Sequence, residues 1–236
     1  MNKVIVLLLT LLTATVAFAD KPIDGVVDVN QIAARINCPF GVQTYVWDFN
    51  QGSHGFTTST CDASGGVPAW AYGAEPNLAG YTVWGTVLGG NYPASTGEAL
   101  VSPSFLVTPA TSLVQVTHYF DTELNYDGCN LMAGDQVIIP MEGYTIPAIS
   151  PSTSYYAYCV EGQPGYSGHD LADWTLITSC FDISALMGET VDLRFQFGAD
   201  TSVQYPGWYL ASVIVGGETG VPVEAQTWSA VKGLFN

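Results

Sequence analysis

The chain has 236 residues, of which 48% are hydrophobic and only 11% are charged. Its 21 Asp and Glu residues against 5 Lys and Arg residues give a formal net charge of −16 at pH 7. A surface this acidic repels phosphate backbones, so the composition excludes a nucleic-acid-binding protein, and the length fits one domain of generous size.

The first 19 residues have the three parts of a secretory signal peptide. A short positive region around Lys3 precedes an apolar run over residues 4–18, and Ala17-Phe18-Ala19 forms an A-x-A cleavage site. The apolar run is shorter than the roughly 20 residues that a membrane-spanning helix needs. Gly, Pro and polar residues interrupt the later apolar segments, so we predict a secreted or cell-surface protein with no transmembrane segment.

The rest of the chain divides into a leader, a β-rich domain and a tail. Residues 20–40 lack a strand pattern and are predicted to be a leader or linker, with a short helix around residues 29–35. Residues 41–217 are predicted to form the folded domain. In the tail, residues 218–236, apolar side chains recur at helical spacing. This pattern favours either a short amphipathic helix or a terminal segment that docks on its own domain. With Trp228 and Lys232 the tail also resembles short C-terminal segments of some secreted bacterial proteins, and this resemblance implies a role in sorting or attachment.

Short β-prone runs separated by turn residues characterise the domain. The clearest runs cover residues 44–49, 113–120, 191–197 and 209–215. Period-2 runs of this kind indicate an antiparallel sandwich or barrel, so the predicted fold class is all-β. In the third run the alternation places Val191, Leu193, Phe195 and Phe197 on one face and Asp192, Arg194 and Gln196 on the other.

Helical periodicity is nearly absent from the domain, apart from one predicted turn at residues 183–187. The predicted core therefore consists of inward-facing strand residues and aromatic side chains. Its members are Trp47, Trp84, Leu113, Phe195, Phe197 and Trp208.

The chain contains five cysteines, and export makes disulfides chemically plausible. We expect Cys38 to pair with Cys61 and Cys129 with Cys159. The odd number leaves at least one thiol free or bonded to another chain, and the sequence does not indicate which one. No C-x-x-C motif occurs, so the sequence indicates neither a redox motif nor a structural zinc site.

Four stretches in chain order carry a family resemblance. They are residues 83–92 with 100–103, residues 118–123 with 126–128, residues 181–184 leading into 193–200, and residues 207–209. Together they resemble the jelly-roll accessory domain beside immune inhibitor A-type secreted metallopeptidases, which is related to MAM-like, choice-of-anchor adhesion modules. The resemblance implies a two-sheet jelly-roll β-sandwich. It does not extend to the peptidase, because the chain has no H-E-x-x-H motif.

Asp121, Glu123 and Asp127 are the densest acidic group in the domain. Residues two apart on a strand share a face, so Asp121 and Glu123 are predicted to project together, with Asp127 in the following turn. Hard oxygen ligands of this kind suit Ca²⁺, and the resemblance implies that jelly rolls of this type hold such an ion. The sequence departs from the resemblance at Ala211 and Ser212, where acidic residues usually follow Gly-Trp-Tyr. The alternatives are a calcium site and a solvated acidic turn.

No catalytic residue is assigned. His118 precedes the acidic group, where a histidine paired with a carboxylate would serve acid–base catalysis, but we interpret it as a structural histidine between strands. The sequence Gly165-Tyr166-Ser167-Gly168-His169 lacks the final Gly of a G-x-S-x-G nucleophile elbow. Asp121 and Glu123 could reach the roughly 5 Å separation of a retaining glycosidase, but any same-face pair would do so.

Three functions are open at this point. The leading one is a secreted, non-enzymatic β-sandwich module for adhesion or binding at the cell surface, with carbohydrate or an extracellular protein as ligand. An exposed aromatic strip at residues 155–158 would stack on sugar rings, whereas ordinary strand packing is the simpler interpretation. The second is a structural subunit of an extracellular assembly or filament that self-associates through a strand edge. The third is a hydrolase of unknown type. No cofactor other than Ca²⁺ is predicted.

Overall fold

The computed structural model describes residues 37–60, 67–150, 157–169 and 174–218. The predicted signal peptide, the helices of the leader and tail, and Tyr155 and Tyr156 of the aromatic strip lie outside the described residues. Among the described residues, no helix has the length and apolar character that crossing a membrane requires.

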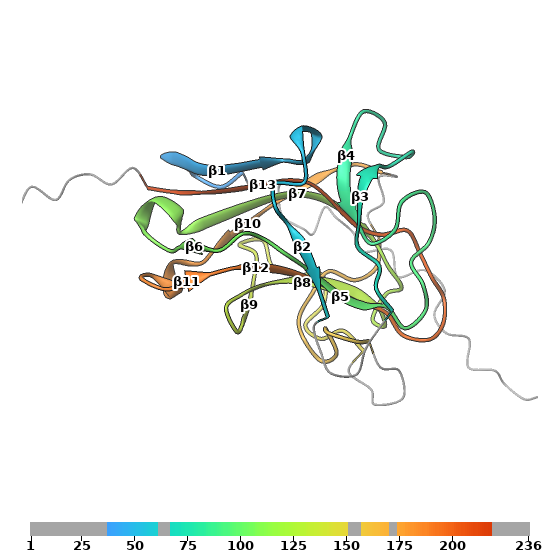
Figure 1. Ribbon diagram of the computed structural model, residues 1–236. Helices are drawn as coiled ribbons and strands as arrows, with labels where there is room; N and C mark the ends of the chain where they lie inside the picture. The colour runs from blue at the N-terminus through green and yellow to red at the C-terminus, as the bar shows by residue number, and fades with distance from the viewer. Residues whose placement is uncertain (1–36, 61–66, 151–156, 170–173, 219–236) are drawn as a thin grey trace, which may run out of the picture.

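The described chain forms β-strands joined by loops and three single-turn 3₁₀ helices (Figure 1). The elements in chain order are β1 (Val42–Asp48), η1 (Phe49–Gln51), β2 (Thr57–Ser59), β3 (Ala71–Ala74), β4 (Thr82–Gly85), β5 (Gly97–Val101), β6 (Phe105–Leu106), η2 (Pro109–Thr111), β7 (Leu113–Asp121), β8 (Gly128–Ala133), β9 (Gln136–Ile138), β10 (Ile177–Asp182), η3 (Ser184–Leu186), β11 (Thr190–Val191), β12 (Leu193–Gly198) and β13 (Gly207–Gly217).

Two antiparallel sheets pack face to face as the two layers seen in Figure 1. The first sheet has the strand order β10-β7-β13-β4-β3, and β1 also pairs along β13. The second has the order β2-β5-β12-β8-β9, and β6 pairs with β11 beside it. The chain passes repeatedly from one layer to the other, for example between β4 and β5, between β7 and β8, between β9 and β10, and between β12 and β13, as in a jelly roll. The predicted all-β, two-sheet sandwich is confirmed.

The predicted alternation along residues 191–197 is also confirmed. Val191, Leu193, Phe195 and Phe197 are at most 3% exposed and belong to the core between the sheets. The run is divided at Asp192, however, because Val191 pairs with Phe105 on β6 whereas the following residues pair with β5 and β8. Trp47, Trp84 and Trp208 lie in the same core.

The prediction for Leu113 is wrong. Val114, Val116 and Phe120 are the inward-facing residues of β7, and Leu113 is only half-buried. The outer face of β7 carries Leu113 together with Gln115, Thr117, Tyr119 and Asp121, so the polar residues of the strand put Leu113 on the outside. Tyr119 packs there with Tyr209 in a second buried cluster that includes Leu78 from the loop before β4. The apolar character of Leu113 alone pointed to the wrong face, and the polar residues two and four positions later give the correct one.

Both predicted disulfide pairings are wrong. Cys38 is bonded to Cys180, 142 residues later, and Cys129 is a free, buried thiol. Cys159 is disulfide-bonded, while Cys61 lies outside the described residues. The pairing follows from the sheet: Cys180 lies opposite Gln115 on β7, and the backbone N–H of Cys38 donates to the Gln115 side chain at 2.9 Å.

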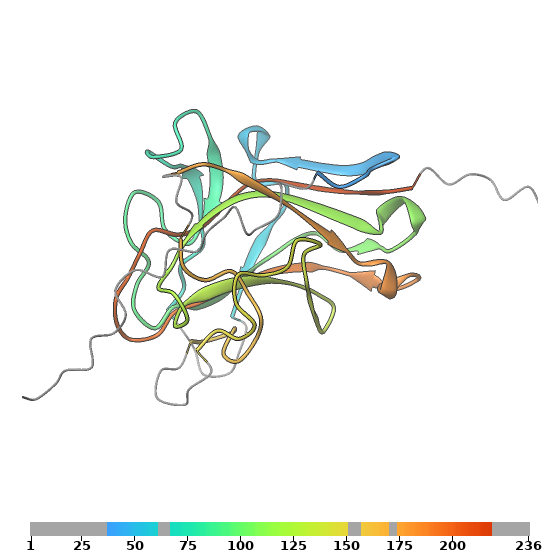
Figure 2. The same ribbon diagram turned by 180° about the vertical axis from the view of Figure 1, so that it is seen from behind.

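The connection between β9 and β10 packs along β8 (Figure 2). Tyr166 exchanges two backbone hydrogen bonds with Cys129, and the Ser167 hydroxyl donates to the backbone oxygen of Asp127 at 2.7 Å. Gly165 has no room for a side chain, because a Cβ there would meet the Cys129 carbonyl oxygen at 2.6 Å. The hydrogen bonds from Tyr166 and Ser167 hold the turn between β7 and β8, which carries Glu123 and Asp127.

Candidate metal centre and polar groove

Three carboxylates from different parts of the chain converge at one end of the sandwich. Glu123 and Asp127 lie between β7 and β8, and Asp200 follows β12. One carboxylate oxygen of each lies within 4.8 Å of the others. The three residues are 7%, 0% and 1% exposed, respectively, so this is a buried acidic group.

Backbone and side-chain donors hold Asp127 in the middle of the group. Its Oδ2 accepts from the Tyr92 hydroxyl at 2.7 Å, and its Oδ1 accepts from the backbone N–H of Asp200 at 2.7 Å. The Tyr92 oxygen in turn accepts from the backbone N–H of Glu123 at 3.2 Å. Asp200 uses Oδ1 to accept from the backbone N–H of Ser202, while its buried Oδ2 has no hydrogen-bond partner.

The group carries more negative charge than its surroundings neutralise. Burial raises the pKa of Asp127 to about 8; the charges of Asp200 and Glu123 add to this effect, and the hydrogen bonds from the Asp200 backbone and Tyr92 oppose it. Arg194 is the only Lys or Arg among the described residues, and it pairs with Asp192. A buried carboxylate without a cationic partner takes up a proton or a metal ion.

The donor set fits a hard divalent cation. Calcium binds carboxylate oxygens at about 2.4 Å, so two oxygens on one ion lie at most about 4.8 Å apart. The three carboxylates of Glu123, Asp127 and Asp200 satisfy that limit. The buried Asp200 Oδ2 is a further acceptor that lacks a donor.

The structure brings together two of the three acidic residues named from the sequence. Asp121 is not a member of the group. It is the last residue of β7, and its charge helps to raise the pKa of Tyr209, which belongs to the outer cluster of that sheet. Because the chain turns after Asp121, the two-residue spacing does not place Glu123 on the same face. The third residue of the group is Asp200, which lies in a loop 73 residues after Asp127. No local sequence pattern connects residues so far apart.

His118 lies in the core, fully buried between three strands. Its Nδ1 accepts from the Trp208 indole N–H at 3.0 Å, so its Nε2 carries the proton and donates to the Ser179 hydroxyl, also at 3.0 Å. Ser179 continues the chain to the Tyr166 hydroxyl at 2.7 Å. Burial lowers the pKa of His118 to about 3. These contacts match the structural interpretation of this histidine.

A polar groove of about 410 Å³ crosses the outer face of the second sheet. Cross-strand pairing explains its composition, because paired residues point to the same face of a sheet. Thr57, Val101 and Arg194 form one row, and Ser59, Ala99 and Gln196 form the next. The lining consists of Thr57, Thr58, Ser59, Thr60, Ala99, Val101, Asp192, Arg194 and Gln196.

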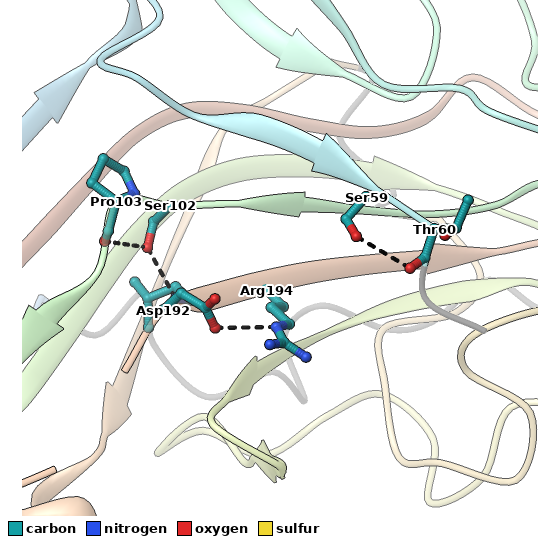
Figure 3. Close-up of polar contacts among 7 residues, drawn as sticks. Ser59, Thr60, Ser102, Pro103, Asp192 and Arg194 are labelled. Atoms are coloured by element: carbon teal, nitrogen blue, oxygen red, sulfur yellow. Dashed lines mark hydrogen bonds and ion pairs between the residues drawn. The ribbon is translucent and has the colours of Figure 1, made fainter. Parts of the chain in front are cut away.

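The charged pair of the groove is held at the start of β12 (Figure 3). The Ser102 hydroxyl accepts a hydrogen bond from the backbone N–H of Leu193 at 2.9 Å, and the backbone N–H of Ser102 donates to the backbone oxygen of Leu193. Next to this anchor, Asp192 Oδ1 accepts from Arg194 Nε at 3.1 Å. The other carboxylate oxygen of Asp192 and both terminal nitrogens of Arg194 have no partner among the described residues.

Gln196 contributes an unusual polar atom to the groove. The residue is 6% exposed, and its buried Oε1 has no hydrogen-bond partner. Most buried acceptors in folded proteins are satisfied, so an unsatisfied one that lines a groove is a candidate ligand contact. The sequence placed Asp192, Arg194 and Gln196 on one face, but gave no sign that this face is hollowed or that Thr57 and Ser59 border it.

No protein-family model matches the chain, and no curated protein does. Among solved structures, the K1 cleaved adhesin domain of Lys-gingipain from Porphyromonas gingivalis W83 is similar at 17% identity and a TM-score of 0.42, over 74% of this chain and 98% of that one. The K2 cleaved adhesin domain of Lys-gingipain is similar at 13% identity and a TM-score of 0.38, over 72% and 98%. Both scores are low, so the fold assignment rests on the strand order and register. The immune inhibitor A-like or MAM-like type stays a prediction.

Proposed function

We propose that this chain is a secreted, non-enzymatic binding module that acts in adhesion at the cell surface, with a carbohydrate or an extracellular protein as its ligand. The observation that supports this function is the groove across β2, β5 and β12. It gathers a fixed Arg–Asp pair, a glutamine amide and four hydroxyl side chains around an open volume of about 410 Å³. Volumes of this size accommodate ligands, and the polar atoms without partners supply the contacts.

The arrangement of titratable groups favours binding over catalysis. A general acid or base must reach its substrate, and His118 and the acidic group of Glu123, Asp127 and Asp200 are all buried. Among the described residues that line the groove there is a single carboxylate, Asp192, and no His or Cys. A hydrolase that works with two carboxylates has no pair there.

The buried acidic group has a supporting role in this proposal. Calcium bound by Glu123, Asp127 and Asp200 would join the turn between β7 and β8 to the loop after β12. It would replace the proton that burial otherwise keeps on Asp127. The ion is then a structural cofactor that stabilises this end of the sandwich, away from the ligand.

Self-association is the second candidate function, and strand β1 favours it. Within the described residues β1 pairs only with β13, so its other edge is open. Residues 43–46 are all exposed, with Tyr45 at 38% and Val46 at 51%. An exposed edge with apolar side chains is a template for adding a strand from another copy. Sedimentation velocity at increasing protein concentration measures this: a monomer throughout contradicts the subunit function.

Binding of purified mature protein to whole cells of the producing organism, and to extracellular polymer from the same culture, tests the proposed function. We expect saturable binding that falls when Arg194 and Gln196 are both changed to Met. The matched control is Gln43→Ala, which removes an exposed amide from β1 in the other sheet. Equal binding by the groove variant and the control contradicts a binding module that acts through this groove.

A further inference from the structure

We propose that the groove recognises an uncharged glycan, with Arg194, Asp192 and Gln196 as the residues that select it. This inference rests on the proposed binding function and assigns its ligand class. The evidence comes from the donors and acceptors of the groove, from its charge, and from the side chains that it lacks.

The Arg194–Asp192 pair presents a donor and an acceptor side by side. The bond between Arg194 Nε and Asp192 Oδ1 leaves the two terminal guanidinium nitrogens and the second carboxylate oxygen to a ligand. Neighbouring hydroxyl groups of a sugar ring each donate and accept, so two of them can engage both members of such a pair at once. Hydrogen bonds to charged groups are also the stronger class.

Gln196 adds an acceptor that the protein itself does not satisfy. Its buried Oε1 lies without a donor on the strand that also carries Arg194. A ligand hydroxyl that donates to Oε1 would remove the cost of leaving this acceptor unmet. The hydroxyls of Thr57 and Ser59 border the same groove from β2. The polar floor thus offers donors and acceptors in the mixture that a polyhydroxylated ligand needs.

The charge of the chain excludes a polyanionic ligand. The formal net charge is −16, and the one basic residue of the groove is neutralised by Asp192. A sulfated or polyuronic chain would therefore meet a repulsive field with no spare positive charge to offset it. The selected glycan is uncharged.

The lining also lacks the anchors of a protein interface. Protein partners are held mainly by aromatic and large apolar side chains that fill pockets. Within the part of the chain that the structure describes, the only apolar residues of the groove are Ala99 and Val101. None of the described lining residues is aromatic either. The sugar is then bound by hydrogen bonds without stacking, and single-site affinity is low. Display of many copies on a surface compensates for low affinity through multivalency.

The test is titration of the mature protein with multivalent conjugates of uncharged oligosaccharides of glucose, mannose, galactose and N-acetylglucosamine. Heparin and polygalacturonate serve as anionic comparisons. We expect binding to at least one uncharged conjugate and none to the anionic ones. Arg194→Met and Gln196→Met should each weaken that binding about tenfold, the loss of roughly one good hydrogen bond. Gln43→Ala should not change it.

Melting temperature separates a ligand contact from a structural role for Gln196. Gln196→Met keeps the volume of the side chain and removes the unsatisfied oxygen, so the free protein should melt at the same or a higher temperature. A variant that loses glycan binding and melts lower contradicts the assignment of Gln196.

The two proposals fail in different ways. Groove-dependent binding to cells without binding to any uncharged conjugate overturns the glycan inference and leaves the binding module. Glycan binding that Arg194→Met and Gln196→Met leave unchanged also overturns it. Absence of binding to cells, polymer and conjugates overturns both.

Discussion

The indole N–H of Trp208 donates to Nδ1 of His118 across 3.0 Å in the middle of the sandwich. This bond joins β13 to β7 and leaves the remaining ring proton of the histidine for Ser179 on β10. In the neutral ring Nδ1 accepts one hydrogen bond and Nε2 donates the other, and the side chain is completely buried. A proton added to Nδ1 would face the Trp208 N–H, so protonation of His118 breaks the network. The core of this sheet is therefore sensitive to acid.

His118 should make the folded protein less stable as the pH drops below 6.5. The ordinary pKa of histidine is 6.5 and that of His118 is about 3, so the unfolded chain takes up a proton over this range and the folded chain does not. This contribution is present above pH 6.5 and is lost at about 1.4 kcal/mol per pH unit as the pH falls toward 3. The raised pKa of Asp127, about 8, changes stability in the opposite direction over part of the same range, so the effect of His118 is measured as a difference between two proteins. Urea unfolding at pH 7, 5.5 and 4.5 should show the stability advantage of the wild type over His118→Gln shrinking as the pH falls, while His54→Gln, on a partly exposed histidine, should follow the wild type.

Calcium should stabilise the folded protein through Asp200. An ion that binds only the native state raises the free energy of unfolding by about 2.7 kcal/mol at a hundredfold excess over its Kd. Thermal melts with millimolar Ca²⁺ should show this increase, and Mg²⁺ should give less because it prefers a tighter octahedral site. Asp200→Asn should abolish the increase, and Asp121→Asn should leave it, since Asp121 lies outside the group. Equal shifts with both ions in all three proteins would indicate only relief of self-repulsion in an acidic chain.

Truncation of core residues tests the phase of the strands. Phe195→Ala should lower the free energy of unfolding by about 3–5 kcal/mol, because Phe195 is completely buried. Leu113→Ala should cost less than about 1 kcal/mol, because Leu113 is half-buried at the start of β7. Chemical denaturation gives both values. A larger loss for Leu113 than for its inward neighbour Val114 would reverse the assigned faces of this strand.

Removal of the disulfide between Cys38 and Cys180 should lower the free energy of unfolding by about 2–5 kcal/mol. The double variant Cys38→Ser, Cys180→Ser tests this without reducing other bonds. Cys129→Ala is the matched control, because this buried thiol is free and makes no cross-link. A thiol reagent should label Cys129 only under denaturing conditions. Rapid labelling of the native protein would contradict its burial.

The alternation of apolar and polar residues predicted the fold class and the inward face of β12, because this alternation is contained within a single strand. The alternation of Phe195 and Phe197 with Arg194 and Gln196 is visible in the sequence, and the two phenylalanines are buried in the core as it predicts, although Gln196 on the other face is buried as well. The acidic group and the disulfide depend on residues that the sandwich brings together from far apart. The residues next to Asp200 and Cys180 in the sequence do not indicate that Asp200 lies beside Asp127 or that Cys180 is bonded to Cys38. At Leu113 the local signal was available in Gln115 and Thr117 on the same face, and the prediction failed because it followed the single apolar residue at the strand start.

The bond from Cys38 to Cys180 also decides where mechanical load enters the domain. Cys180 lies opposite Gln115 on β7, and Gln115 lies opposite Ile214 on β13. Tension applied to the chain before Cys38 therefore passes directly into the central ladder of three strands and bypasses β1. Cys180 is level with Ile214, close to the end of β13 at Gly217, so a pull between these two points would open the three strands from that end. The covalent bond thus places the load on the edge formed by β10, β7 and β13 and leaves β1 unloaded.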